Sequence, residues 1–68
     1  MMGSEFCNNR ILGLAHVWFE FSDTEINRDE VEKFVRMYSL GFSYIPESHI
    51  GRVVDEIMED LVGYVEAS

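Results

Sequence analysis

The chain has 68 residues, and its 13 acidic residues outnumber its 5 lysines and arginines, which gives a formal net charge of −8. A chain of this length forms one domain with a small core, and its single cysteine, Cys7, excludes an internal disulfide. The negative charge disfavours direct binding to nucleic-acid phosphates and to anionic membrane surfaces.

Residues 7–68 are predicted to form the single domain. Gly3-Ser4-Glu5-Phe6 is a peptide that two adjacent common cloning sites encode, so residues 1–6 are interpreted as a cloning remnant or a disordered terminus. No signal peptide is visible, and the longest apolar stretch, residues 11–19, is too short to span a bilayer. Together with the lone cysteine, these features predict a cytoplasmic protein.

The segment Arg10–Ser22 has a pattern that favours a β-strand. Its odd positions from 11 to 21 are all apolar or glycine, while its even positions from 16 to 22 are His, Trp, Glu and Ser. This alternation is typical of a strand with one buried face. A helix is the alternative, because Leu14, Trp18 and Phe21 lie at helical spacing.

A helix is predicted from about Arg28 to Leu40. Asn27 is a good N-cap residue, Glu30 supplies a capping-box-like partner, and Gly41 is a natural stop. The apolar stripe of this helix is Val31, Phe34, Val35 and Tyr38.

A second helix is predicted from near Glu47 to between Leu61 and Val65. Pro46 suits a first helical turn, Ser48 is a competing N-cap, and Gly63 is expected to weaken the last turn. Apolar residues recur at three- and four-residue steps, at Ile50, Val53, Val54, Ile57, Met58, Leu61 and Val65.

These elements predict an α+β fold, with one N-terminal strand followed by two amphipathic helices. Self-association is the commonest way for a short chain to enlarge its core, so we expect a homodimer that pairs through the strand. If the first segment is helical instead, the fold is all-α.

Charge is distributed differently on the two predicted helices. Acid-first pairs, Asp29 with Lys33 and Glu32 with Arg36, neutralise the first helix. The second helix carries like charges four residues apart, which cost stability and indicate an acidic face kept for a basic partner. A solvated face that maintains solubility is the alternative. The acidic residues of this face are Asp55, Glu56, Glu59 and Asp60.

No constellation of residues indicates an enzyme, a metal site or a cofactor site. Cys7, His16 and His49 lack the close paired spacing of zinc ligands, and no glycine run resembles a phosphate-binding loop. Aromatic residues are the better candidates for function, because exposed aromatic side chains often anchor protein interfaces. The predicted apolar anchors are Trp18 with Phe42 or Tyr44.

The order strand, helix, glycine, helix from about His16 to Val65, with Gly41 between the helices, resembles the ribbon-helix-helix proteins. The resemblance implies a strand-paired dimer that acts as a transcriptional regulator or antitoxin. Glu20 and Asp23 depart from the basic and polar groups with which that family reads bases, so an antitoxin-like or partner-binding role fits better than DNA binding.

The chain also resembles a degenerate EF-hand pair. Trp18-Phe19-Glu20-Phe21-Ser22-Asp23 is similar to the end of an entering helix, and Gly63-Tyr64-Val65 to the glycine-x-hydrophobic signature. The residues that match the spacing after a loop are Ile26, Glu30, Val31, Phe34 and Val35. Too few residues precede Ile26 for a calcium loop of about twelve. The resemblance therefore implies a calcium-free lobe that binds an amphipathic helix in an apolar groove.

The sequence as a whole predicts a small, acidic, non-enzymatic protein-binding module, such as an inhibitor of a nucleic-acid-binding enzyme or an adaptor. The expected partner is another protein with a basic or amphipathic surface, contacted through the acidic face and the aromatic anchors defined above. The identity of that partner is not encoded in any motif.

Overall fold

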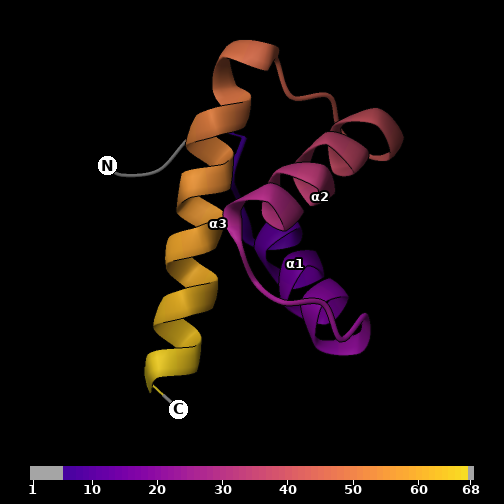
Figure 1. The fold of residues 1–68 in the computed structure, drawn as a ribbon. Coiled ribbons are helices and arrows are strands. Elements are labelled where there is room, and N and C mark those ends of the chain that lie inside the picture. Colours follow the sequence, from indigo (N-terminus) through magenta and orange to yellow (C-terminus); the bar gives the residue numbers. More distant parts are fainter. Residues whose placement is uncertain (1–5, 68) are drawn as a thin grey trace.

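The computed structural model describes residues 6–67, with side chains for residues 6–63, and it contains three helices: α1 (Asn9–Phe21), α2 (Arg28–Gly41) and α3 (Glu47–Ala67). α3 is the longest helix, and α1 and α2 pack against one side of it (Figure 1). The described residues include no strand, so the predicted α+β fold is wrong and the all-α alternative is confirmed.

α1 replaces the predicted strand because its N-terminus is capped. The Asn8 side-chain oxygen accepts hydrogen bonds from the backbone N–H groups of Arg10 and Ile11, at 3.0 and 3.3 Å. An asparagine in this role satisfies donors that the first helical turn leaves without partners. The strand through which a homodimer was expected is therefore absent, and dimerisation itself stays a prediction.

The alternating pattern of this segment comes from two helical stripes. One stripe, Ile11, Ala15 and Phe19, is buried in the core. The other stripe, Gly13, Val17 and Phe21, is exposed. Within each stripe, successive residues are four positions apart, which is a helical spacing. Because one stripe is shifted by two positions from the other, apolar residues or glycine occur at every second position of the sequence, as they do in a strand.

The predicted boundaries of α2 and the start of α3 are confirmed. The Asn27 side chain accepts from the Glu30 backbone N–H at 2.9 Å, and α2 ends at Gly41. α3 begins at Glu47, so Ser48 does not cap it, and it continues through Gly63 to Ala67. The side chains of Tyr64 and Val65, to which the EF-hand resemblance extends, lie outside the described residues.

Phe34 of α2 is the central ring of the core. It is almost fully buried, and its centroid lies 6.2 Å from that of Phe19 and 6.3 Å from that of Tyr38. A single aromatic side chain of α2 thereby lies beside a ring of α1. The other buried members of the core are Ile11, Ala15, Val31, Val35, Ile45, Ile50, Val53, Val54, Ile57 and Leu61.

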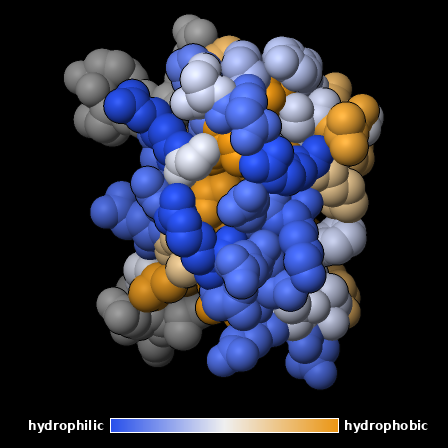
Figure 2. All heavy atoms as spheres, turned by 45° about the horizontal axis from the view of Figure 1, so that its top comes forward, coloured by the Kyte–Doolittle hydropathy of each residue, from blue (hydrophilic) through white to orange (hydrophobic). Residues whose placement is uncertain are grey.

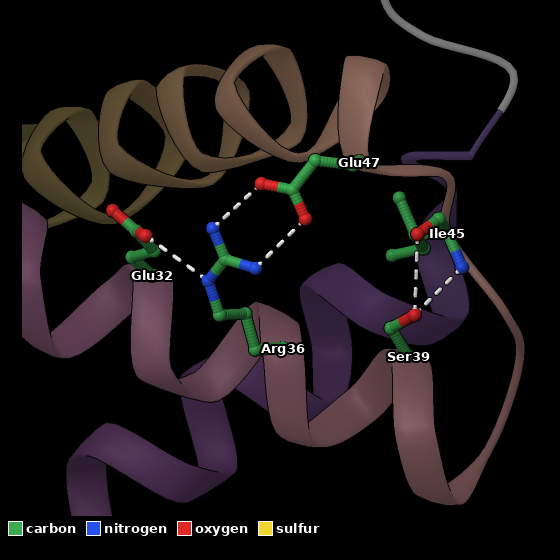
Figure 3. A network of polar contacts seen from close by, with 5 residues as sticks. All are labelled: Glu32, Arg36, Ser39, Ile45 and Glu47. Carbon is green, nitrogen blue, oxygen red and sulfur yellow. Dashed lines mark hydrogen bonds and ion pairs between the residues drawn. The ribbon is translucent and has the colours of Figure 1, made fainter.

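Polar contacts fix the connection between α2 and α3 (Figure 3). The Arg36 guanidinium donates to both carboxylate oxygens of Glu47, at 2.9 and 3.0 Å, and to Glu32 at 3.0 Å. The Ser39 hydroxyl accepts from the Ile45 backbone N–H at 2.8 Å and donates to the Ile45 carbonyl at 3.3 Å. These contacts hold the start of α3 against the end of α2.

The N-terminal segment reaches α3 as well. The ring centroid of Phe6 lies 4.8 Å from that of His49. Phe6 belonged to the predicted cloning remnant or disordered terminus, and the rest of that stretch, residues 1–5, lies outside the described residues.

Core packing on α3 can be tested with two substitutions that each remove one methylene group. Ile57→Val should lower the free energy of unfolding by about 0.5–1.5 kcal/mol, because Ile57 is fully buried between the helices. Leu40→Val should change it by less than about 0.5 kcal/mol, because Leu40 is 90% exposed. Urea denaturation followed by circular dichroism measures both values, and equal losses would contradict this packing.

Candidate functional site

An open apolar groove lies between α1 and the end of α2. Its volume is about 600 Å³, within the range of sites that hold ligands or side chains of a partner. Val17 on α1 is 51% exposed, and Phe42 just after α2 is 65% exposed. The residues that line it are Arg10, Gly13, Leu14, Val17, Tyr38 and Phe42.

Two residues that line this groove, Tyr38 and Phe42, belong to a row of aromatic rings that continues through Phe34 to Trp18 of α1. The Trp18 ring lies 6.0 Å from Phe34, and Tyr38 next along α2 stacks on Phe42 with centroids 5.3 Å apart and an angle of 21°. Trp18 and Phe42 stand exposed at the two ends of this row, whereas Phe34 and Tyr38 between them are buried. The exposed rings are thus fixed in place by buried ones.

The predicted aromatic anchors fall into two groups. Trp18 and Phe42 belong to the same aromatic row, but Tyr44 lies in a separate hollow of about 230 Å³, with Leu40 and Ile45. Figure 2 shows the distribution of hydrophilic and hydrophobic side chains over one face of the molecule. Hydrophilic side chains cover most of that face, and hydrophobic atoms are visible in a central hollow and at the edges.

The four acidic residues predicted on α3 do not form one free face. Asp55 forms an ion pair with Arg28 of α2, and a carboxylate oxygen of Asp60 lies 2.6 Å from Nε2 of His16 on α1. Their predicted role in partner binding stays a prediction.

The remaining two acids of that set differ in their surroundings. Glu56 accepts a hydrogen bond from the thiol of Cys7, and Glu59 is exposed. Most of the acids on α3 therefore help to hold neighbouring segments.

Ion pairs with arginine change the pKa values on both sides of α2. Hydrogen bonding to Asp55 raises the pKa of Arg28, and hydrogen bonding to Glu47, then to Glu32, raises that of Arg36. The pKa of Glu47 is lowered by its hydrogen bonds to Arg36. On α2, Lys33 lies 3.5 Å from Glu30, so the predicted pairing of Lys33 with Asp29 is not found, whereas that of Glu32 with Arg36 is confirmed.

Three acids that the sequence analysis did not select gather where α1 ends. Glu20, Asp23 and Glu25 are exposed and form no ion pair among the described residues. The sequence indicates that these acids lack a nearby basic residue along the chain, because no lysine or arginine occurs between Arg10 and Arg28. None of these three acids, Glu20, Asp23 and Glu25, lines the groove.

Cys7 is poorly suited to nucleophilic chemistry. Burial, followed by its hydrogen bond to Glu56 and the negative charges of Glu56 and Asp60, raises the pKa of the Cys7 thiol to about 12. Only the thiolate is an effective nucleophile. Over the described part of the chain, no cluster of three or more His, Cys, Asp or Glu residues has the geometry to hold a metal ion.

No protein-family model matches this chain, and no match was found among curated proteins or solved structures. The ribbon-helix-helix and EF-hand resemblances thus have no support from a detected relative. None of the helices in the described residues combines the length and apolar content needed to cross a bilayer.

The raised pKa of Cys7 predicts a slow thiol. At about pH 8 the folded protein should react with iodoacetamide at least a hundredfold more slowly than the chain unfolded in urea, because little thiolate is present. Glu56→Gln should speed the folded-state reaction, since it removes a negative charge beside the sulfur. Alkylation followed by mass spectrometry measures the rates, and similar rates in both states would contradict the assignment.

Proposed function

We propose that this chain is a small, acidic, non-enzymatic protein-binding module that receives an amphipathic helix of a partner protein in the groove between α1 and α2. The observation that carries the proposal is the second apolar stripe of α1, of which Val17 and Phe21 stay exposed and Gly13 and Val17 line the groove. An inhibitor or an adaptor would use such a groove in the same way.

The distribution of apolar residues around α1 supports this proposal. A surface helix of a soluble domain normally has one apolar stripe and an opposite polar face. α1 buries Ile11, Ala15 and Phe19, yet it also exposes Val17 and Phe21, the latter by 80%. Apolar residues on two faces indicate that a second surface covers the exposed one.

The composition of the groove favours a helix as the ligand. Amphipathic helices bind apolar grooves through side chains at positions i, i+3 or i+4, and i+7. Aromatic anchors with few freely rotating bonds, here Phe42 in the groove and Trp18 at the other end of the aromatic row, lose little conformational entropy on binding. Gly13 lies on the wall of the groove, and no atom lies within 4 Å of where its Cβ would be, so a partner backbone can approach closely.

Binding can be tested with a designed helical peptide that has leucines on one face and evenly spaced lysines on the other. We expect it to quench or shift the fluorescence of Trp18, the only tryptophan, and to move the amide resonances of Gly13, Val17 and Phe42. Val17→Ser should weaken binding at least tenfold, because it removes exposed apolar surface from the groove.

Leu40→Ser is the matched control, since Leu40 is also an exposed aliphatic residue but lies in the separate hollow with Tyr44. It should bind the peptide as the unmodified protein does. Equal losses in both variants, or resonance changes centred on Leu40 and Tyr44, would place the binding surface elsewhere and contradict the proposal.

A further inference from the structure

We propose that the partner helix carries a carboxylate that pairs with Arg10 where this arginine lines the groove. The inference rests on the proposed function and adds one charged group to the apolar chemistry of the partner. Among the described residues that line the groove, Arg10 alone is charged. The net charge of the whole chain, −8, favours a basic partner, so the groove and the molecule as a whole favour different charges in a ligand.

The guanidinium of Arg10 is not used within the fold. It forms no ion pair with any residue that the structure describes. No acidic residue occurs between Glu5 and Glu20, so Arg10 has none at the three- or four-residue spacing that allows pairing along a helix. Most of the other cations do contact acids of α2 or α3, namely Arg28, Lys33 and Arg36.

Occupation of the groove links apolar binding to charge pairing. A helix that lies in the groove displaces water from the surface around Arg10. The other described residues of the lining carry no negative charge, so the guanidinium would lose hydration and gain no charged partner from its own chain. A carboxylate on the partner helix supplies two acceptor oxygens for the planar guanidinium and offsets this loss.

The spacing along α1 places this carboxylate on the partner. Arg10, Gly13, Leu14 and Val17 lie on one face of α1, because they are three and four residues apart. Arg10 is the first residue of this row, and Val17, seven residues later, is its last. Seven residues correspond to about 10 Å, or two helical turns. On a partner helix that runs along α1, the carboxylate therefore lies about two turns from the side chain that contacts Val17.

The test uses pairs of helical peptides with a leucine face and lysines elsewhere. The two members of a pair differ at one position beside the leucine face, which is glutamate in one and glutamine in the other, and this position moves by one turn from pair to pair. In at least one pair the glutamate peptide should bind about tenfold more tightly, as measured by titration calorimetry. Arg10→Gln should reduce that ratio to about one. Equal affinities within every pair, or a ratio that persists in Arg10→Gln, would overturn the inference.

Arg52→Gln is the matched control. Arg52 is also an exposed arginine without an ion pair in the described part of the chain, but it lies on α3 and does not line the groove. The substitution changes the net charge equally, so it should leave the ratio unchanged. Loss of the ratio in both variants would attribute it to net charge and overturn the inference.

The side-chain Nε–H resonance of Arg10 provides a direct readout. It should move further with the glutamate peptide than with its glutamine counterpart, because only the former supplies a charged acceptor. Equal movement with both peptides would show that the guanidinium contacts no carboxylate and would overturn the inference. Arg10→Gln should not lower the melting temperature, because a cation in the first turn opposes the helix dipole.

Val17→Ser separates this inference from the proposed function. It should weaken both members of every pair, because both use the apolar wall of the groove. Equal affinities within the pairs, together with weaker binding to Val17→Ser, would overturn the role of Arg10 and leave the groove supported. Unchanged binding to Val17→Ser would overturn the proposed function as well. A dimer of the free protein that Val17→Ser dissociates would identify a second copy as the occupant and overturn the assignment to a different protein.

Discussion

The structure depends on the apolar face of α3, against which both α1 and α2 pack. α1 contributes Ile11, Ala15 and Phe19 to the core, and the rings of Phe19 and Trp18 also lie beside Phe34 of α2. α2 is fixed by the same face of α3 and by its polar contacts to the start of that helix. A small domain has little core to spare, so both shorter helices depend on one apolar face. The outer stripe of α1, Gly13, Val17 and Phe21, faces away from that core and stays exposed.

Charge in this protein is divided between two uses. Arg28, Arg36 and His16 meet acids across helix boundaries, so several acids on α3 serve to connect the elements. Exposed pairs of this kind add little stability individually, but they fix the relative positions of the helices. Glu20, Asp23 and Glu25, at and after the end of α1, form no such pair among the described residues. Net charge therefore describes the molecule poorly, and the position of each unneutralised carboxylate is more informative.

The sequence was sufficient to predict α2 and the start of α3. An N-cap residue such as Asn27, followed by a single apolar stripe at helical spacing, indicates a helix and not a strand. It was misleading for α1, where a buried stripe and an exposed stripe together have the period of a strand. Trp18 and Phe42 are exposed, and their role as anchors stays a prediction, while their connection through Phe34 and Tyr38 is a tertiary feature. The pairing of Asp55 with Arg28 and of Asp60 with His16 likewise depends on how helices pack, so periodicity could not show that these acids have partners. The prediction failed for α1 because this helix carries more apolar residues than it buries in the core.

The two stripes of α1 also have a consequence for how this protein can change over generations. Gly13, Val17 and Phe21 face away from the core, and Ile11, Ala15 and Phe19 face into it. Substitutions in the first set alter the outer surface with little effect on folding, while those in the second set affect folding and leave that surface in place. Natural selection can therefore adjust the specificity of this helix almost independently of its stability. We therefore expect relatives to differ more on the outer stripe of α1 than on its buried stripe.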